Sequence, residues 1–389
     1  MGSYVYQLKD GRGRALYGFA EAISKAELKR QLRGINFYFI AAQSFDERKL
    51  LRKKVDQEAL LAFTHRLASL IDSGIPILSA MNILWRQTED KTLQLVVSHI
   101  RHRLEQGSKI SEALDDFPSV FPPLYRAMVG IAEKTGGLST VLRRLVEHLE
   151  YQKRFITKIK KAITYPIIVT TFAVIVLIGM FTFIVPIFAE VLTSLNSDLP
   201  LFTQVVLKIS QFLKSIYGIP VILLAGIALF FLYKRLRNIR KFSIEMDRLK
   251  LKIPAIGYVL YSIAISRFTH ALNMMLGAGV SIVESFEVAK TTVNNQYIVE
   301  GIDIVQRDVE QGVSLYNAFQ EAKVFPVMLM EMVGIGESSG TVVKVFENLA
   351  THFDEEVDYK LNKFVTIMEP LLIIFVGFIV EDWLVILIF

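Results

Sequence analysis

Two long charge-free runs stand out in the pattern of hydrophobic and polar residues along the chain. The first extends from Ala162 to Ala189, and twenty of its residues would span about 30 Å as a helix, the thickness of a bilayer's hydrocarbon core. The second extends from Ser215 to Tyr233, and membrane helices tolerate the glycines and proline that interrupt it. We therefore predict membrane helices at 162–189 and 215–233, joined by a loop at 190–214.

A third apolar run lies at 370–389. Leu371 to Val380 is apolar, but Glu381 and Asp382 follow. Each acid would cost about 2.5–3.5 kcal/mol at the centre of a bilayer. A membrane helix here therefore requires either that a partner buries both acids or that the C-terminus of this sequence is atypical.

Basic residues cluster at one end of the first two predicted membrane helices. Five precede the first helix and five follow the second: Lys153, Arg154, Lys158, Lys160 and Lys161, then Lys234, Arg235, Arg237, Arg240 and Lys241. The loop between them has only two lysines, against Glu190 and Asp198. Because basic flanks mark the cytoplasmic side, we predict that both large polar segments are cytoplasmic and that the loop is extracytoplasmic.

The two polar segments repeat one another with a shift of 204 or 205 residues. The matching pairs include Phe63 and Phe268, His65 and His270, Gly74 and Gly279, Gln106 and Gln311, Pro122 and Pro326, Glu133 and Glu337, His148 and His352, and Pro166 and Pro370. Chance would not keep one register over so many positions. Because Pro166 opens the first membrane helix, we expect Pro370 to open an equivalent one.

Within each half, apolar residues recur at steps of three and four, as Leu60, Phe63 and Leu67 do, and glycines fall where these patterns stop. Each half therefore predicts a small antiparallel helical bundle, at 51–161 and 234–369. The expected fold class is an all-α membrane protein with two homologous cytoplasmic helical bundles, about three transmembrane helices and a small N-terminal α+β appendage.

The appendage is expected at 1–50, which has no counterpart in the second half. Tyr4 to Leu8 alternates like a short strand, and two glycines after it indicate a turn. Ser24, followed by Glu27, is typical of a capping box that starts a helix ending near Leu32.

Two acid–glycine turns are the candidate functional positions. Glu133 and Glu337 precede Gly136 and Gly340 by three residues, between helical stretches. The structural interpretation is a helix–helix turn with a left-handed glycine and an acid that accepts hydrogen bonds from backbone N–H groups. The alternative, functional interpretation is that these turns bind a partner or form a dimer contact. Catalysis is not indicated, because no base or nucleophile accompanies either acid.

Other chemistry finds little support in the sequence. There is no cysteine, which excludes disulfides, thiolate metal sites and cysteine nucleophiles. No phosphate-binding loop, dinucleotide fingerprint or hydrolase motif occurs, and the six histidines match no zinc pattern. We therefore predict a protein that is not an enzyme and needs no cofactor or metal.

The mean hydropathy of +0.40 indicates concentrated apolar runs, and the net charge of +6 fits basic flanks that face anionic membrane lipid. The basic run Arg48 to Lys54 is expected to form a solvated face or linker, with a lipid-facing or partner-facing patch as the alternative. Nucleic acid is not an expected partner, because no aromatic stacking pattern accompanies these residues.

Several short motifs, taken in order and in duplicate, resemble one known family. They are Phe63-x-x-x-Leu67-x-x-Leu70, Gly74-Ile75-Pro76, Gln106-Gly107, Phe121-Pro122, Glu133-x-x-Gly136 and Tyr165-Pro166, and the second copy repeats most of them through Met368-Glu369-Pro370. The chain resembles the type II secretion F family, which includes the platform proteins of type IV pili and of the mannose-sensitive haemagglutinin pilus. It departs from that family at Ala132, where glycine is usual, and at Glu381 to Trp383.

The resemblance implies a platform in the bacterial inner membrane with two helical cytoplasmic domains and three spans. It also implies that the protein docks a hexameric secretion ATPase and contacts pilins or pseudopilins and other inner-membrane assembly proteins. A homodimer is a further expectation from the family. The acid–glycine turns of the family correspond to Glu133, Gly136, Glu337 and Gly340.

Two other classes remain as alternatives. An oligomeric transporter or channel subunit could also contain repeats, although here most of the repeated mass lies outside the predicted membrane helices. A membrane enzyme ranks third, because no constellation of catalytic residues is present.

Overall fold

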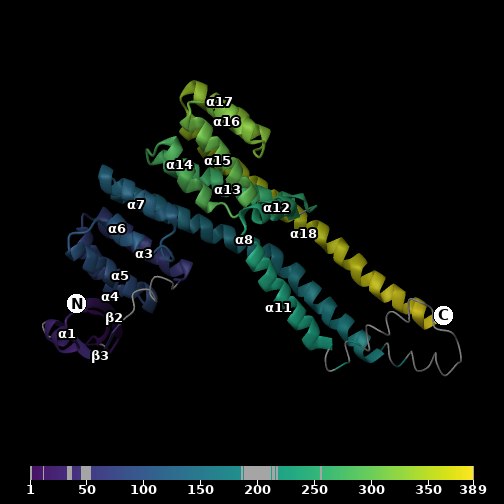
Figure 1. The fold of residues 1–389 in the computed structure, drawn as a ribbon, viewed down its shortest axis with the longest axis horizontal. Helices are drawn as coiled ribbons and strands as arrows, with labels where there is room; N and C mark the ends of the chain where they lie inside the picture. Colours follow the sequence, from purple (N-terminus) through teal and green to yellow (C-terminus); the bar gives the residue numbers. More distant parts are fainter. Residues whose placement is uncertain are drawn as a thin grey trace.

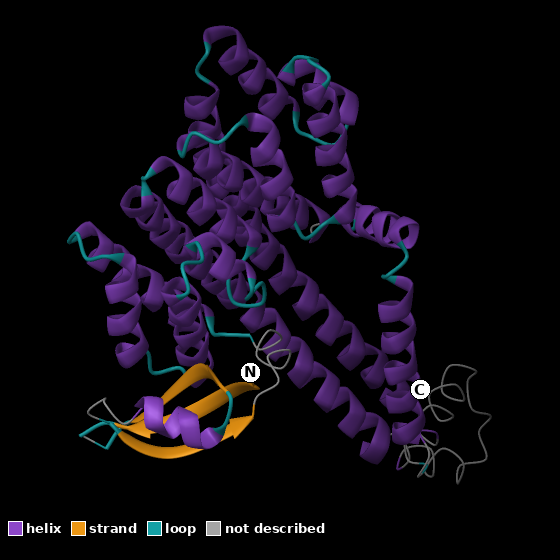
Figure 2. Cartoon of the chain, turned by 60° about the vertical axis from the view of Figure 1, so that its left-hand side comes forward, coloured by secondary structure: helices purple, strands orange, loops and turns teal. Residues whose placement is uncertain are grey.

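The computed structural model describes residues 2–11, 13–32, 37–44, 54–184, 187, 212, 215, 218–254 and 256–388. The described chain is mostly helical, with one small sheet at its N-terminal end (Figures 1 and 2). Nearly all of the predicted loop at 190–214 lies outside these residues.

The N-terminal appendage is a three-stranded antiparallel sheet with one helix. Strands β1 (Gly2–Lys9), β2 (Ala15–Ala22) and β3 (Tyr38–Ser44) lie in the order β2-β1-β3. Helix α1 (Lys25–Gln31) begins after Ser24, whose side chain accepts a hydrogen bond from the Glu27 N–H. The predicted strand and capped helix are confirmed, whereas β2 and β3 were not predicted.

Side chains of the first helical half hold the outer edge of this sheet. The backbone N–H of Tyr17 donates to Gln94 Oε1 at 2.8 Å, and that of Phe19 donates to Ser98 Oγ at 2.9 Å. In return, Trp85 Nε1 donates to the Tyr17 carbonyl at 2.7 Å. The appendage is thereby fixed to the helices beneath it, because the unpaired edge of β2 is satisfied by polar side chains.

The same order of six helices occurs twice. The first set is α3 (Gln57–Asp72), α4 (Ile77–Gln87), α5 (Lys91–Glu105), α6 (Ile110–Asp115), α7 (Pro123–Thr135) and α8 (Leu138–Gly179), which a π-helical turn η2 (Met180–Ile184) extends. The second is α13 (Ile256–Gly277), α14 (Ile282–Ala289) with the 3₁₀ turn η3 (Lys290–Thr292), α15 (Gln296–Glu310), α16 (Leu315–Ala322), α17 (Val327–Ser339) and α18 (Val342–Ile388). Helices α11 (Gly218–Leu236) and α12 (Arg240–Lys252) connect the sets.

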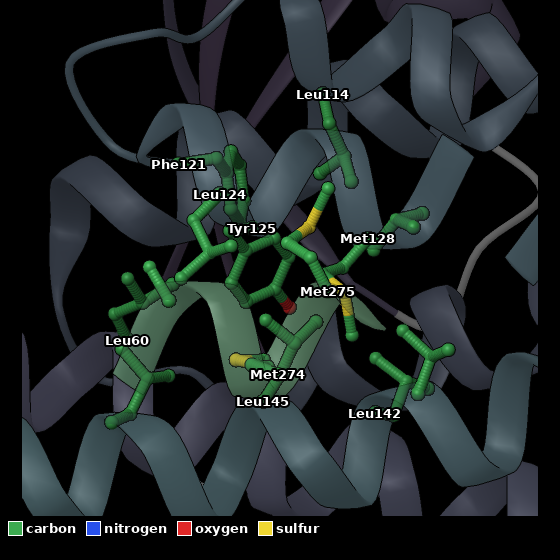
Figure 3. Packing of buried hydrophobic residues seen from close by; sticks show 14 of the residues in the cluster. Leu60, Leu114, Phe121, Leu124, Tyr125, Met128, Leu142, Leu145, Met274 and Met275 are labelled. Atoms are coloured by element: carbon green, nitrogen blue, oxygen red, sulfur yellow. The ribbon is translucent and has the colours of Figure 1, made fainter. Parts of the chain in front are cut away.

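Apolar faces of the two sets pack into one continuous core. The predicted core residues Leu60, Phe63 and Leu67 are all buried. Met275 of α13 is buried among first-half residues such as Tyr125 (Figure 3). The halves therefore share part of their hydrophobic core.

Two helices run without a break from the packed region into the apolar runs. Helix α8 continues through Pro166, and α18 continues through Pro370. Beyond the bundles, α8 and α11 expose large apolar side chains, such as Phe172 at 67% and Leu224 at 65%. In Figures 1 and 2, α8, α11 and α18 extend from the bundles in the same general direction.

Among the described residues, α8 is the one helix that is long and apolar enough to cross a bilayer by itself. Helices α12 and α13 pass the same test only if they are counted together as one bent span. The number of spans therefore stays a prediction, and so do the predicted domain boundaries. The side chains of Glu381 and Asp382 lie outside the described part of α18.

Candidate functional site at the junction of the two halves

The first acid–glycine turn joins α7 to α8. Gly136 has a φ of 78°, in the left-handed region where glycine carries no steric cost. The Glu133 carboxylate accepts hydrogen bonds from the backbone N–H of Ile110 at 2.9 Å and from the N–H and hydroxyl of Ser111. Glu133 therefore caps the N-terminus of α6, the neighbouring helix, whose positive end favours a negative charge.

The second turn repeats this geometry. Gly340 has a φ of 69°, and Glu337 Oε1 accepts from the Leu315 N–H at 2.9 Å at the start of α16. In both copies the carboxylate is engaged with backbone donors of the same bundle. A role of these turns in binding a partner stays a prediction.

A polar cluster centred on Asp354 connects the two halves. The Asp354 carboxylate on α18 accepts hydrogen bonds from the Tyr151 hydroxyl of α8 at 2.6 Å and from Ser266 of α13 at 2.7 Å. His270 Nε2, also on α13, lies 2.6 Å from its other oxygen. The ring of Tyr151 stacks on that of His270 with centroids 3.9 Å apart. We call Tyr151, Ser266, His270 and Asp354 the junction cluster.

Electrostatics favour an ionised Asp354 within the junction cluster. Burial alone would raise the pKa of the Asp354 carboxyl. The hydrogen bond and charge of His270 outweigh this effect, helped by hydrogen bonds from the Tyr151 and Ser266 hydroxyls, and the pKa lies below its usual value. Burial raises the pKa of Tyr151, and the neighbouring Asp354 raises it further, so Tyr151 stays a neutral donor. The cluster is therefore an anion held by three donors from two other helices.

Apolar contacts and an ion pair extend the junction toward the apolar runs. Phe155 of α8 packs in one buried cluster with Val259 of α13 and Leu361 of α18. Beside it, Lys158 Nζ lies 2.6 Å from Asp358 on α18, with both side chains well exposed. Helices α8 and α18 are thus joined by a partly buried polar cluster, a buried apolar cluster and a surface ion pair.

A cavity of about 370 Å³ lies beside the junction cluster, between the halves. His148, Tyr151 and Phe155 line it from α8, and Arg267 and His270 line it from α13. Burial lowers the pKa of His148 to about 4, with a smaller effect from His270, so this imidazole is neutral at physiological pH. None of the described residues that line the cavity is Asp or Glu.

The repeated histidines have different surroundings in the two halves. His270 belongs to the junction cluster, whereas its counterpart His65 is exposed on α3. Within the described residues, no group of three His, Asp or Glu side chains could hold a metal ion. Asp354 and Tyr151 were missed by sequence reasoning. One available signal was that Asp354 interrupts the buried apolar stripe formed by Ala350, Phe353 and Val357.

The duplicated helices agree with a comparison to known families. A family model described as type II secretion system, protein F, matches residues 63–186 and again residues 268–381. The chain belongs to this family. The two matches fall on the two sets of helices, so the predicted internal repeat is confirmed, and so is the family resemblance.

Individual relatives of the protein F family cover almost the whole chain. The chain is 34% identical to the type IV pilus assembly protein PilC of Thermus thermophilus, over 97% of this chain and 94% of that protein. It is 30% identical to PilC of Pseudomonas aeruginosa, over 86% of this chain and 89% of that protein. It is 26% identical to the type II secretion system protein F of Vibrio cholerae, over 96% and 93%. The relatives thus come from both pilus assembly and protein secretion.

Proposed function

We propose that this protein is the inner-membrane platform of a type IV pilus or type II secretion system, and that it couples a cytoplasmic secretion ATPase to the assembly of pilins or pseudopilins. Membership of the protein F family and the names of its relatives support the platform assignment. The structural observation that carries the coupling is the continuity of α8 and α18 from the bundles into the apolar runs.

Continuous helices suit such a coupling because packed helices move as rigid bodies. Helix α8 has 42 residues and α18 has 47, which correspond to about 60 and 70 Å. The junction cluster ties the two helices together within the N-terminal third of each, through Tyr151 and Asp354. A displacement at either bundle would therefore move both helices.

The proposed topology has three spans, at 162–189, 215–233 and 370–389, with both helical domains in the cytoplasm. The asymmetry of basic residues and the exposed apolar side chains of α8 and α11 support this arrangement. The proposed partners are a hexameric secretion ATPase on the cytoplasmic side, pilins or pseudopilins in the bilayer, other inner-membrane assembly proteins and a second copy of the chain.

The geometry of the junction cluster argues against hydrolytic catalysis. In a serine hydrolase, the serine hydroxyl donates to the histidine, which the acid orients. Here the Ser266 hydroxyl donates directly to Asp354, and His270 bonds to the other oxygen of the same carboxylate. Among the described contacts of Ser266, none is a hydrogen bond to a histidine base, which fits a structural role.

A deletion strain tests the proposed function. Loss of the gene should abolish surface pili or secretion, whereas the purified secretion ATPase of the same system should hydrolyse ATP at its usual rate. Plasmid-borne wild-type protein should restore assembly. Normal pili and normal secretion in the deletion strain would contradict the proposal.

A further inference from the structure

A group of exposed apolar side chains lies where α12 meets α13. Leu249, Ile253, Ile256 and Tyr258 are 54%, 43%, 44% and 67% exposed. We call these four residues the α12–α13 corner. Helix α12 precedes the second half, whereas strand β3 is the last element described before the first half.

Contacts of α13 place this corner at the membrane-facing end of the second half. Along α18, Asp354 meets Ser266, whereas Lys360, nearer the apolar run, meets Ser262 at 2.8 Å. Helices α13 and α18 are therefore antiparallel, and the N-terminal end of α13 points toward the apolar runs. Figures 1 and 2 both show α12 at the upper end of α11.

The distance to the predicted membrane edge is short. Val259, in the first turn of α13, packs against Phe155 of α8. Phe155 precedes the charge-free run, which begins at Ala162, by seven residues, or about 10 Å of helix. The headgroup layer itself is several ångströms thick on each side, so the proposed topology puts the corner near its inner boundary.

The angle between α12 and α13 is supported by a close backbone approach and by contacts of α12 with the bundle. The axes of α12 and α13 differ in direction by 116°. A Cβ atom at Gly257 would lie 2.1 Å from the Leu251 carbonyl oxygen, so this close approach requires glycine. On the inner face of α12, Asp247 accepts from the Gln296 N–H at 2.9 Å and pairs with Lys250 at 2.7 Å. These contacts hold α12 against the bundle.

Basic side chains surround the exposed apolar group. Helix α12 contains five basic and two acidic residues, and Lys241, Arg248 and Lys252 are exposed. Arg240 is 75% exposed and lies 3.7 Å from Asp303, a weak pair at the surface. Apolar and aromatic side chains beside exposed cations are typical of segments that lie in the membrane interface.

We propose that the α12–α13 corner is a lipid-binding surface, which inserts Leu249, Ile253, Ile256 and Tyr258 into the cytoplasmic headgroup layer of an anionic bilayer. Arg248 and Lys252 contact the lipid phosphates, with their aliphatic stems along the apolar surface. This assignment rests on the proposed topology, in which both bundles are cytoplasmic. It gives the second bundle an attachment to the membrane in addition to the predicted spans.

Single-cysteine labelling tests the proposal, since the natural chain contains no cysteine. Three variants would carry an environment-sensitive fluorophore in vesicles of phosphatidylglycerol and phosphatidylcholine: Tyr258→Cys, Ile335→Cys and Ile175→Cys. Ile335, on α17, is 66% exposed and is the matched control remote from the corner. Ile175, on the apolar run of α8, is 61% exposed and is the control for the proposed topology. Brominated lipids should quench the labels at positions 258 and 175 but not the label at position 335.

The outcomes separate this proposal from the proposed function. If position 175 is quenched and position 258 behaves like position 335, the lipid-binding assignment is wrong while the topology stands. If position 175 is not quenched, the proposed topology itself fails.

The role of the anionic headgroups is tested on the Tyr258→Cys background. Pure phosphatidylcholine vesicles should reduce the quenching, and so should the pair Arg248→Gln and Lys252→Gln. The control Arg143→Gln removes an exposed cation of the first half and should have no effect. Quenching that is independent of lipid charge and of both cations would overturn the anionic-lipid assignment.

Discussion

Replacement of Asp354 by alanine should weaken the attachment between the two halves. The substitution removes the acceptor of three hydrogen bonds, from Tyr151, Ser266 and His270. A hydrogen bond contributes about 1 kcal/mol net, and more when one partner is charged. The hydroxyls of Tyr151 and Ser266 are 3.0 Å apart and can bond to one another once the acid is gone. We therefore expect a loss of about 2 kcal/mol in the free energy of unfolding.

The matched control is Asp358→Ala, one helical turn further along α18. Asp358 also joins the halves, through Lys158, but the two side chains are 44% and 57% exposed. An exposed ion pair contributes about 0–1 kcal/mol. Urea unfolding of the purified protein in detergent, followed by circular dichroism, would compare both variants with the wild type. Equal stability losses in the two variants would refute a special role for the junction cluster.

The pH dependence of the same variant has a definite sign. The folded-state pKa of Asp354 lies below its usual value of 3.8, so the unfolded chain takes up protons first as the pH falls. The stabilisation from this carboxylate is thus complete well above pH 4 and is lost as the pH falls through the lower folded-state pKa. Asp354→Ala should flatten the acid limb of a stability profile in that range.

Three further predictions concern other residues of the bundles. Burial lowers the pKa of His148 to about 4, from an ordinary 6.5, so the unfolded chain binds a proton at this residue first as the pH falls. The free energy of unfolding of the wild type should therefore fall by up to about 3 kcal/mol between pH 6.5 and pH 4. Unfolding of His148→Gln, measured over the same pH range, should not show this loss. Glu337→Ala should cost about 1 kcal/mol in urea unfolding because it removes an acceptor from the first N–H groups of α16. Glu331→Ala, exposed on α17 like Glu337 itself, should be neutral. Gly136→Ala should cost about 1 kcal/mol because of its positive φ, and a larger loss in Gly137→Ala, whose φ is −89°, would contradict that reasoning.

Local patterns predicted much of the helical architecture. The glycines at the ends of helical patterns, such as Gly74 and Gly279, adopt positive φ values, and the capped helix after Ser24 forms where its capping residues indicate. The duplication in the sequence returns as two sets of six helices. These features depend on residues close together in the chain or on a register that repeats along it.

The junction cluster depends on contacts that no local pattern encodes. Tyr151 and Asp354 are 203 residues apart, and only the packing of α8 against α18 brings them together. His270 was noted as a repeated position, but its duplicate His65 is exposed, so the repeat alone does not reveal its role. Strands β2 and β3 were missed because neither has a strictly alternating pattern of buried and exposed residues.

The central claim is that both helical halves lie in the cytoplasm and are tied to one membrane. The natural absence of cysteine allows a direct test with Gln106→Cys and Gln311→Cys, which are equivalent exposed positions of the two halves, and with Asp198→Cys in the predicted outer loop. In intact spheroplasts, a membrane-impermeant maleimide should label position 198 alone, and lysis should expose positions 106 and 311 equally. Labelling of position 106 or 311 in intact spheroplasts would place that half outside and contradict the account.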